Sequence, residues 1–286
     1  MADEERELRY AMLNIVATPH PVGVYEKLIR SAAKIPVNFW GDQYASITEP
    51  VLPEGEGDLL LGRLFMWTKI DEDEPAVLTD ALAEVSLHDL HLNIPNNVGF
   101  NGRIFLWVFR LSDHKLFIEL NNEVGRTLSP QRAAKFFGRL LSPEVLGIDS
   151  PFVEVTVCPD DDSLDLVLSV PKLKKISIHL LRPNPDGIDI ETLRILTRLE
   201  TMGAKSQVTE LTKHTGENLE LDQELMAEAR VAATNGYVES KGYEDGESVH
   251  RSTKHYPKIV KRLSSAFASG IAAAISVAKN TLNGEQ

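Results

Sequence analysis

The chain alternates between turn-joined pairs of β-rich segments and amphipathic helical segments, and this alternation limits its fold more than any other feature. Three such pairs lie within residues 44–70, 102–122 and 237–255. In each pair a short polar or glycine-containing turn separates two runs rich in β-branched and aromatic residues, which is the pattern of a β-hairpin. Because hairpins build antiparallel sheets, we expect sheets that are at least partly antiparallel.

Helical periodicity fills the spaces between the hairpins. The best-marked helix begins at Ser129, a favourable N-cap, with Pro130 in its first turn and Phe136 and Phe137 on its apolar face. Further helices are predicted over residues 22–34, 188–202, 221–234 and 263–282. Strands predicted at residues 152–158, 176–181 and 206–212 alternate with helices, as in βαβ-like units. We therefore expect an α+β fold in which mixed or antiparallel sheets are covered by helices, with a helix at the C-terminal end.

Proline and glycine cluster at residues 142–151, where we place the boundary between two parts. The first part, residues 1–145, is strand-rich α+β; the second, residues 150–257, alternates strands and helices. A C-terminal helix over residues 258–282 follows. One continuous sheet shared by both parts is the alternative.

Charge is unevenly distributed along the 286 residues. The formal net charge is −12, yet residues 250–286 hold six basic side chains against one acid, Glu285. The other 249 residues therefore hold 24 basic and 41 acidic side chains. An acidic body with a short basic end favours a partner-binding surface over a substrate pocket.

The chain has no recognisable secretory signal at its acidic start, and Cys158 is its single cysteine. Both observations favour a reducing, cytoplasmic location. Residues 263–282 are apolar but rich in Ala, Ser and Gly. A helix packed on the body or on a second subunit is the favoured interpretation. Association with a membrane surface and a true membrane span are the alternatives.

Basic clusters give the candidate binding residues. Lysine and arginine neutralise phosphates without needing a catalytic geometry, so we expect nucleic-acid contacts at these clusters. The expected contact residues are Arg251, Lys254, Lys258, Lys261, Arg262, Lys172, Lys174 and Lys175. A third basic surface is predicted on the outer face of the Ser129 helix, at Arg132, Lys135 and Arg139. Trp40, Trp67 and Trp107 lie in or beside apolar runs and are expected in the core.

Other polar groups suggest chemistry without completing a motif. His250, Arg251 and His255 could support metal-free RNA cleavage, although Arg251 and His255 are expected on one face of a strand and His250 on the other. Residues 160–162 are three aspartates that could hold Mg²⁺, but helix capping is the simpler interpretation. His88 and His91 lack a third metal ligand, and Cys158 lacks a recognisable partner. We therefore assign no catalytic residue, metal or cofactor.

Several stretches resemble known proteins. Residues 11–29, 62–71 and 100–122 are similar to a group of uncharacterised bacterial proteins of about this length. After Ser129, the order of elements resembles that of phage-exclusion proteins of the bacteriophage lambda Rex A type, with matching places at residues 163–185, 212–219 and 236–243. The resemblance implies a cytoplasmic homodimer that binds nucleic acid in phage exclusion or antiviral defence without being an enzyme.

The sequence thus favours a non-enzymatic, nucleic-acid-binding regulator or sensor of a bacterial defence system, with DNA favoured over RNA as its partner. We expect a homodimer without stable membrane insertion, and a partner protein of the same system is a further candidate. Two alternatives stay open: a nuclease-type toxin or effector enzyme, and a protein-only interaction subunit of a defence complex.

Overall fold

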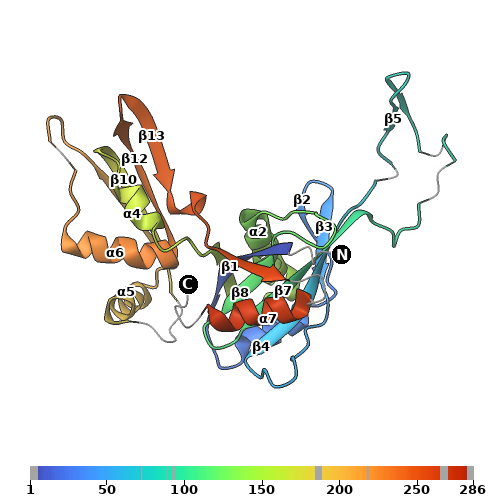
Figure 1. The fold of residues 1–286 in the computed structure, drawn as a ribbon, viewed down its shortest axis with the longest axis horizontal. Coiled ribbons are helices and arrows are strands. Elements are labelled where there is room, and N and C mark those ends of the chain that lie inside the picture. The colour runs from blue at the N-terminus through green and yellow to red at the C-terminus, as the bar shows by residue number, and fades with distance from the viewer. Residues whose placement is uncertain are drawn as a thin grey trace.

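The computed structural model describes residues 6–71, 73–87, 89–91, 94–183, 189–217, 219–264 and 270–281. These residues form two lobes, each built on its own antiparallel sheet, with a long arm projecting from the first lobe (Figure 1). The predicted α+β class is confirmed: helices cover sheets built largely from hairpins.

The sheet of the first lobe has eight strands organised around β1. Its order is β14–β1–β8–β7–β4–β3–β2, and β9 pairs with the far end of β1. The strands are β1 (Arg6–Thr18), β2 (Val37–Trp40), β3 (Gln43–Ile47), β4 (Leu59–Thr68), β7 (Phe100–Arg110), β8 (Lys115–Glu119), β9 (Phe152–Val157) and β14 (Ile259–Ser264). The predicted hairpins appear as β3–β4 and β7–β8. β1 can serve three partners because its 13 residues are long enough to pair with each over a different stretch.

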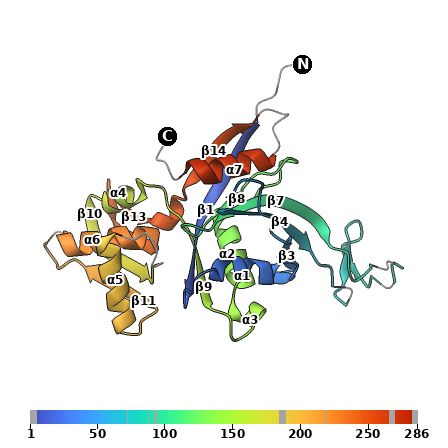
Figure 2. The same ribbon diagram turned by 90° about the horizontal axis from the view of Figure 1, so that it is seen from below.

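Helices cover both faces of this sheet (Figure 2). The helices are α1 (Val24–Ala32), α2 (Pro130–Leu140), α3 (Pro143–Leu146) and α7 (Gly270–Asn280). Buried side chains of α1 and α2 share a core with one set of β1 side chains, including Leu13, whereas α7 shares a second core with Leu8 and Tyr10. Successive residues of a strand point to opposite faces, so β1 contributes side chains to both cores.

The C-terminal segment differs from its prediction. Residues 259–264 form the strand β14, paired with residues 6–11 of β1, and the helix α7 occupies only Gly270–Asn280. The β-branched residues Ile259 and Val260 suit a pleated sheet. α7 buries small side chains, including Ala274 and Ala278, against the first lobe. Among the described residues, no helix combines the length and apolarity needed to cross a membrane.

Arg110 at the end of β7 fastens α7 to the sheet. Its guanidinium donates to both carboxylate oxygens of Asp113, at 2.7 and 2.6 Å, and to the backbone carbonyl of Ala278. It also lies 5.1 Å from the ring centroid of Phe117. Only 3% of the Arg110 side chain is exposed, so its charge is compensated by these partners alone.

Replacing Arg110 by leucine is expected to lower the free energy of unfolding by about 2–4 kcal/mol, because Asp113 and the Ala278 carbonyl lose a buried donor. Denaturant unfolding measures the loss, and hydrogen exchange should show α7 opening before the sheet. The control is Lys279→Ala, which removes an exposed ion pair to Glu56 at the same end of α7 and should cost under about 1 kcal/mol. Equal losses from both variants would contradict the role of Arg110.

A hairpin arm, β5 (Ala76–Leu78) and β6 (Ala83–Val85), extends away from both lobes between β4 and β7 (Figure 1). Exposed apolar side chains on it include Val77 and Leu82. It occupies a stretch whose hydrophobic pattern is too irregular to predict an element.

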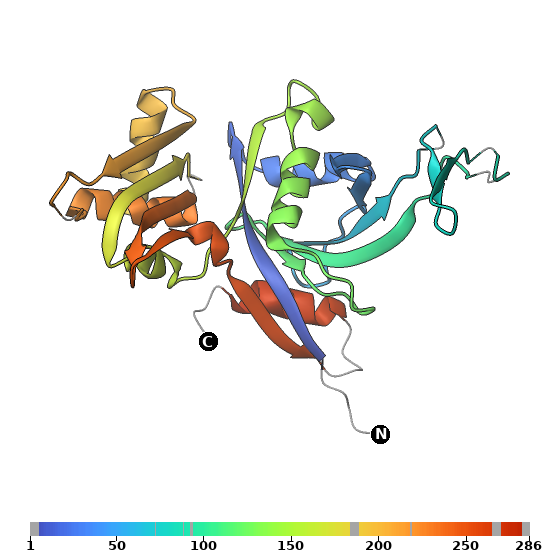
Figure 3. The same ribbon diagram turned by 90° about the horizontal axis from the view of Figure 1, so that it is seen from above.

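The second lobe is a four-stranded antiparallel sheet in the order β11–β10–β12–β13. Its strands are β10 (Lys172–Leu181), β11 (Ser206–Thr212), β12 (Gly236–Glu244) and β13 (Glu247–Ser252). The predicted hairpin at residues 237–255 is formed by β12 and β13. Helices α4 (Ser163–Leu168), α5 (Ile190–Thr201) and α6 (Gln223–Thr234) contribute to the lobe's core. A short 3₁₀ helix, η1 (Thr253–His255), follows β13. Figure 3 shows this lobe beside the first.

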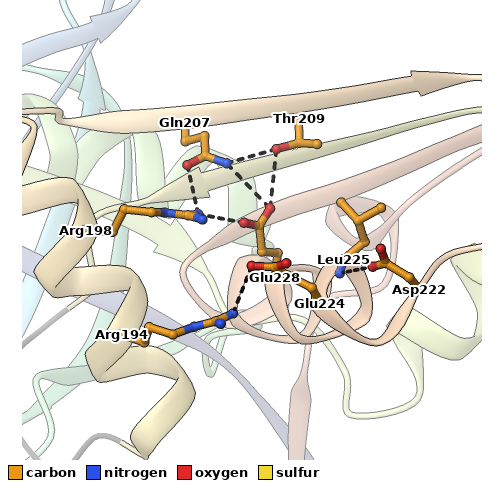
Figure 4. A network of polar contacts seen from close by, with 8 residues as sticks. All are labelled: Arg194, Arg198, Gln207, Thr209, Asp222, Glu224, Leu225 and Glu228. Atoms are coloured by element: carbon orange, nitrogen blue, oxygen red, sulfur yellow. Dashed lines mark hydrogen bonds and ion pairs between the residues drawn. The ribbon is translucent and has the colours of Figure 1, made fainter.

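A buried carboxylate ties α6 to α5 and β11 (Figure 4). Glu228 on α6 accepts a 2.6 Å hydrogen bond from Arg198 on α5 and longer ones from Gln207 and Thr209 on β11. Its side chain is 6% exposed. One turn earlier on the same helices, Glu224 and Arg194 form a solvent-exposed pair at 3.5 Å.

The change from one sheet to the other falls after β9, not at residues 142–151. β9 belongs to the first sheet, and the chain returns to that sheet again at β14. The lobes touch at several points: Asn14 donates to Asn235 at 3.3 Å, and Lys205 pairs with Glu154 at 3.2 Å. The two lobes therefore have separate sheets but do not correspond to two consecutive segments of chain.

Candidate nucleic-acid interface

The two faces of the second sheet have opposite characters. Residues paired directly across an antiparallel sheet point to the same face, so the register assigns every side chain. Ile176, Ile178 and Val238 point toward the helices and are buried. The other face carries the alternate residues and is covered by none of the helices in the described part of the chain, apart from η1 at one end. We call it the open sheet face.

The open sheet face is basic at the end near the β12–β13 turn. Lys172 pairs with Tyr243 across β10 and β12, and Lys175 pairs with Lys241. A bulge in β10 between these pairs brings the Lys174 ammonium to 5.1 Å from the Tyr243 ring centroid. Lys172, Lys174, Lys241 and Tyr243 are exposed, and among the described residues these three lysines form no ion pair. Within the described part of the chain, three lysines without an ion pair therefore lie around one exposed aromatic ring.

Two glutamates lie in the middle of the face. Lys175 bonds to Glu210 at 2.6 Å, and this hydrogen bond, more than any other factor, lowers the pKa of the Glu210 carboxyl. Glu239 lies 3.7 Å from a ring nitrogen of His250. With Lys254 included, the face carries five lysines and these two acids, a formal balance of +3 in a chain whose net charge is −12.

At the other end, η1 folds over the face. The rings of His179 and Tyr237 stack at 4.1 Å, and the Lys254 ammonium lies 3.0 Å from the Tyr237 centroid. Burial lowers the pKa of Lys254 and of His179 and raises that of Tyr237. The cation–aromatic contact places Lys254 at the border of the open sheet face.

Four of the eight predicted contact residues thus come together: Lys172, Lys174 and Lys175 on β10, and Lys254 on η1. Sequence reasoning did not include Lys241 and Tyr243 among them. The alternation of residues 237–243 indicates that Lys241 and Tyr243 share one face of a strand. Assigning that face to the open side of the sheet requires the register with β10.

The other four predicted residues lie elsewhere. Arg251 is on the helix-covered face, where it pairs with Glu244 at 2.7 Å and donates to the Leu166 carbonyl of α4. Lys258 pairs with Asp161 at 2.6 Å. Lys261 and Arg262 are on β14, in the first lobe. Lys261 lies 3.3 Å from Glu7, and Arg262 donates to Ser276. Arg251, Lys258 and Lys261 are each compensated by an acid, so no single positive surface joins them to β10.

The nuclease alternative depended either on a metal held by the aspartates at residues 160–162 or on His250, Arg251 and His255. The prediction of one strand for all three was wrong, because residues 253–255 form η1. His250 and His255 now lie with ring centroids 5.9 Å apart, while Arg251 points to the opposite face of the sheet. The cation needed to stabilise phosphate charge is therefore turned away from the two imidazoles.

The remaining polar candidates are the aspartates at residues 160–162, Cys158, His88 and His91. Asp162 precedes α4 but makes no capping hydrogen bond, and Asp161 binds Lys258 instead. Cys158 is buried, which raises the pKa of its thiol. His88 lies outside the described residues. Among those described, no group of three or more His, Cys, Asp or Glu side chains is placed to hold a metal ion.

Together, the fold and this surface define a two-lobed α+β protein with an open, lysine-rich sheet face that bears the exposed aromatic ring of Tyr243. The chain belongs to the family described as "Domain of unknown function (DUF4747)", whose model matches residues 6–279. The comparison with curated proteins yields no match.

Proposed function

We propose that this protein binds nucleic acid on the open sheet face, without cleaving it. The observation that carries the proposal is the group of three lysines, Lys172, Lys174 and Lys241, around the exposed ring of Tyr243; none of the three has an ion pair among the residues that the structure describes. Lysines neutralise backbone phosphates, and exposed aromatic rings stack on unpaired bases. In other folds, four-stranded sheets with helices on one face bind RNA through aromatic side chains on the other, an analogy of architecture alone.

The acidic body supports selective contact. Most of the molecule repels a polyanion, so an anionic strand is steered to the face where the balance is positive. A role in phage exclusion as a regulator or sensor rests on the resemblance of the sequence to Rex A-type proteins. Homodimer formation stays a prediction from the same source.

The test is fluorescence anisotropy of labelled 20-nucleotide DNA and RNA with the purified protein. If three to five lysines each contact a phosphate, affinity for a single strand should fall about 20- to 100-fold between 50 and 200 mM salt. The strands should stay intact when Mg²⁺ is added, as seen on a denaturing gel. Absence of binding at 50 mM salt would refute the proposed function, and cleavage would favour the nuclease alternative.

A further inference from the structure

Trp40 is an exposed tryptophan on a basic surface of the first lobe. It ends β2, whose residues alternate so that Phe39 is buried and Trp40 faces solvent, with 53% of its surface exposed. The prediction that all three tryptophans lie in the core was wrong for this one, while Trp107 is fully buried. Phe39 packs against Phe136 of α2 at 5.7 Å, and this contact places Trp40 beside the outer face of α2.

Cations of α2 surround the Trp40 ring. The Lys135 ammonium lies 4.3 Å from the ring centroid and the Arg132 guanidinium 5.5 Å from it. Arg132 also donates to Gln43 at 2.9 Å, which fixes its position. Among the described residues, none of Arg132, Lys135 and Arg139 forms an ion pair. The basic outer face predicted for this helix is therefore available to an anion.

A hollow of about 670 Å³ adjoins the Trp40 ring. Its lining includes Asn38, Trp40, Lys135, Arg139 and a single acid, Glu144. The neighbouring Ser142 side chain, more than any other group, lowers the pKa of Glu144. With Arg132 counted, three cations face one anion around an aromatic plane. A flat ring bearing a phosphate, as in a nucleotide, matches this combination.

The surface formed by Trp40, Lys135 and Arg139 is linked to the border of the open sheet face through Gln131 of α2. Gln131, in the first turn of α2, donates to the backbone carbonyl of Lys254 at 3.2 Å, and Lys254 borders the open sheet face. Gln131, Lys135 and Arg139 are spaced four residues apart, so they form one stripe about 12 Å long on the helix. This stripe connects η1 to the surroundings of Trp40.

Resting on the proposed function, we infer that the bound nucleic acid is single-stranded and continues from the open sheet face past η1 onto α2. There Trp40 stacks on an unpaired base while Lys135 and Arg139 contact neighbouring phosphates. A duplex keeps its base faces stacked on one another, so it cannot use the exposed planes of Trp40 and Tyr243.

The test compares Trp40→Ala with the wild type, using anisotropy of a labelled 20-nucleotide oligo(dT) strand at 50 mM salt. Loss of one stacked base should weaken binding about ten-fold, and Trp40→Phe should restore most of it. The matched control is Phe152→Ala, which removes another exposed ring with a lysine over it, Lys205 at 3.8 Å, and should leave affinity unchanged. An unlabelled mixed-sequence duplex should compete at least about ten-fold more weakly than one of its own strands.

The outcomes separate this inference from the proposed function. Unchanged affinity of Trp40→Ala, with binding lost on charge reversal of Lys172 and Lys174, would overturn the Trp40 contact and leave the open sheet face in place. A duplex that competes as well as the single strand would overturn the single-strand assignment. Equal losses of affinity from Trp40→Ala and Phe152→Ala would show that removing any exposed ring weakens binding, and would overturn the Trp40 contact. No binding by the wild type would refute both proposals.

Discussion

Charge reversal of Lys172 and Lys174 to glutamate is expected to weaken nucleic-acid binding by at least about 25-fold at 0.1 M salt. Each phosphate contact contributes a slope of about −0.7 to the dependence of log affinity on log salt, which at this concentration is about five-fold per contact. Two lost contacts should therefore also reduce the magnitude of that slope by about 1.4. Both side chains are exposed, so the variant should fold normally.

The matched control is the double charge reversal of Lys261 and Arg262. It changes the net charge by the same amount, and these residues were equally strong candidates from the sequence. They lie on β14 in the first lobe, where Lys261 already faces Glu7. Their reversal should leave the affinity within about two-fold and the salt slope unchanged. A larger loss in this control than in the β10 variant would place the interface on β14 and contradict the open sheet face.

Replacing Glu228 by alanine is expected to lower the free energy of unfolding by about 2–3 kcal/mol. The change leaves Arg198, Gln207 and Thr209 without their shared acceptor. Removing one partner of a buried ion pair costs more than the pair contributes, because the other charge stays desolvated. Arg198 is about one-third exposed, which limits the loss. Urea unfolding followed by circular dichroism measures it.

Glu224→Ala is the matched control for Glu228, because it lies on the same helix and pairs with the same neighbouring helix (Figure 4). Its ion pair with Arg194 is more than half exposed on both sides, so the cost should stay under about 1 kcal/mol. Both substitutions improve helix propensity similarly, so that contribution cancels. A Glu228→Ala variant as stable as Glu224→Ala would show that the buried network does not hold α5, α6 and β11 together.

Local sequence patterns were sufficient to predict the helices and hairpins whose signals lie within a few residues. The Ser129 N-cap accepts from the Arg132 amide as predicted, and the polar turn at residues 112–115 joins β7 to β8. The arm and β14 were missed because their pairing depends on distant residues or on irregular patterns. β14 is a strand because the edge of β1 is open to it, more than 240 residues away.

The candidate site, too, could be predicted only in part from the sequence. The sequence by itself determined which side chains are basic, which helix has a cationic outer face, and that an acidic body carries few such clusters. It could not distinguish Lys174, which forms no ion pair with any described residue, from Lys258, which pairs with Asp161, because ion pairs join residues remote in sequence. Only the tertiary structure decided that Lys241 and Tyr243 join Lys172 on one face and that Trp40 lies exposed beside Lys135. For the sheet residues the physical reason is register: a shift of one residue in the β10–β12 pairing would turn Lys241 and Tyr243 toward the helices.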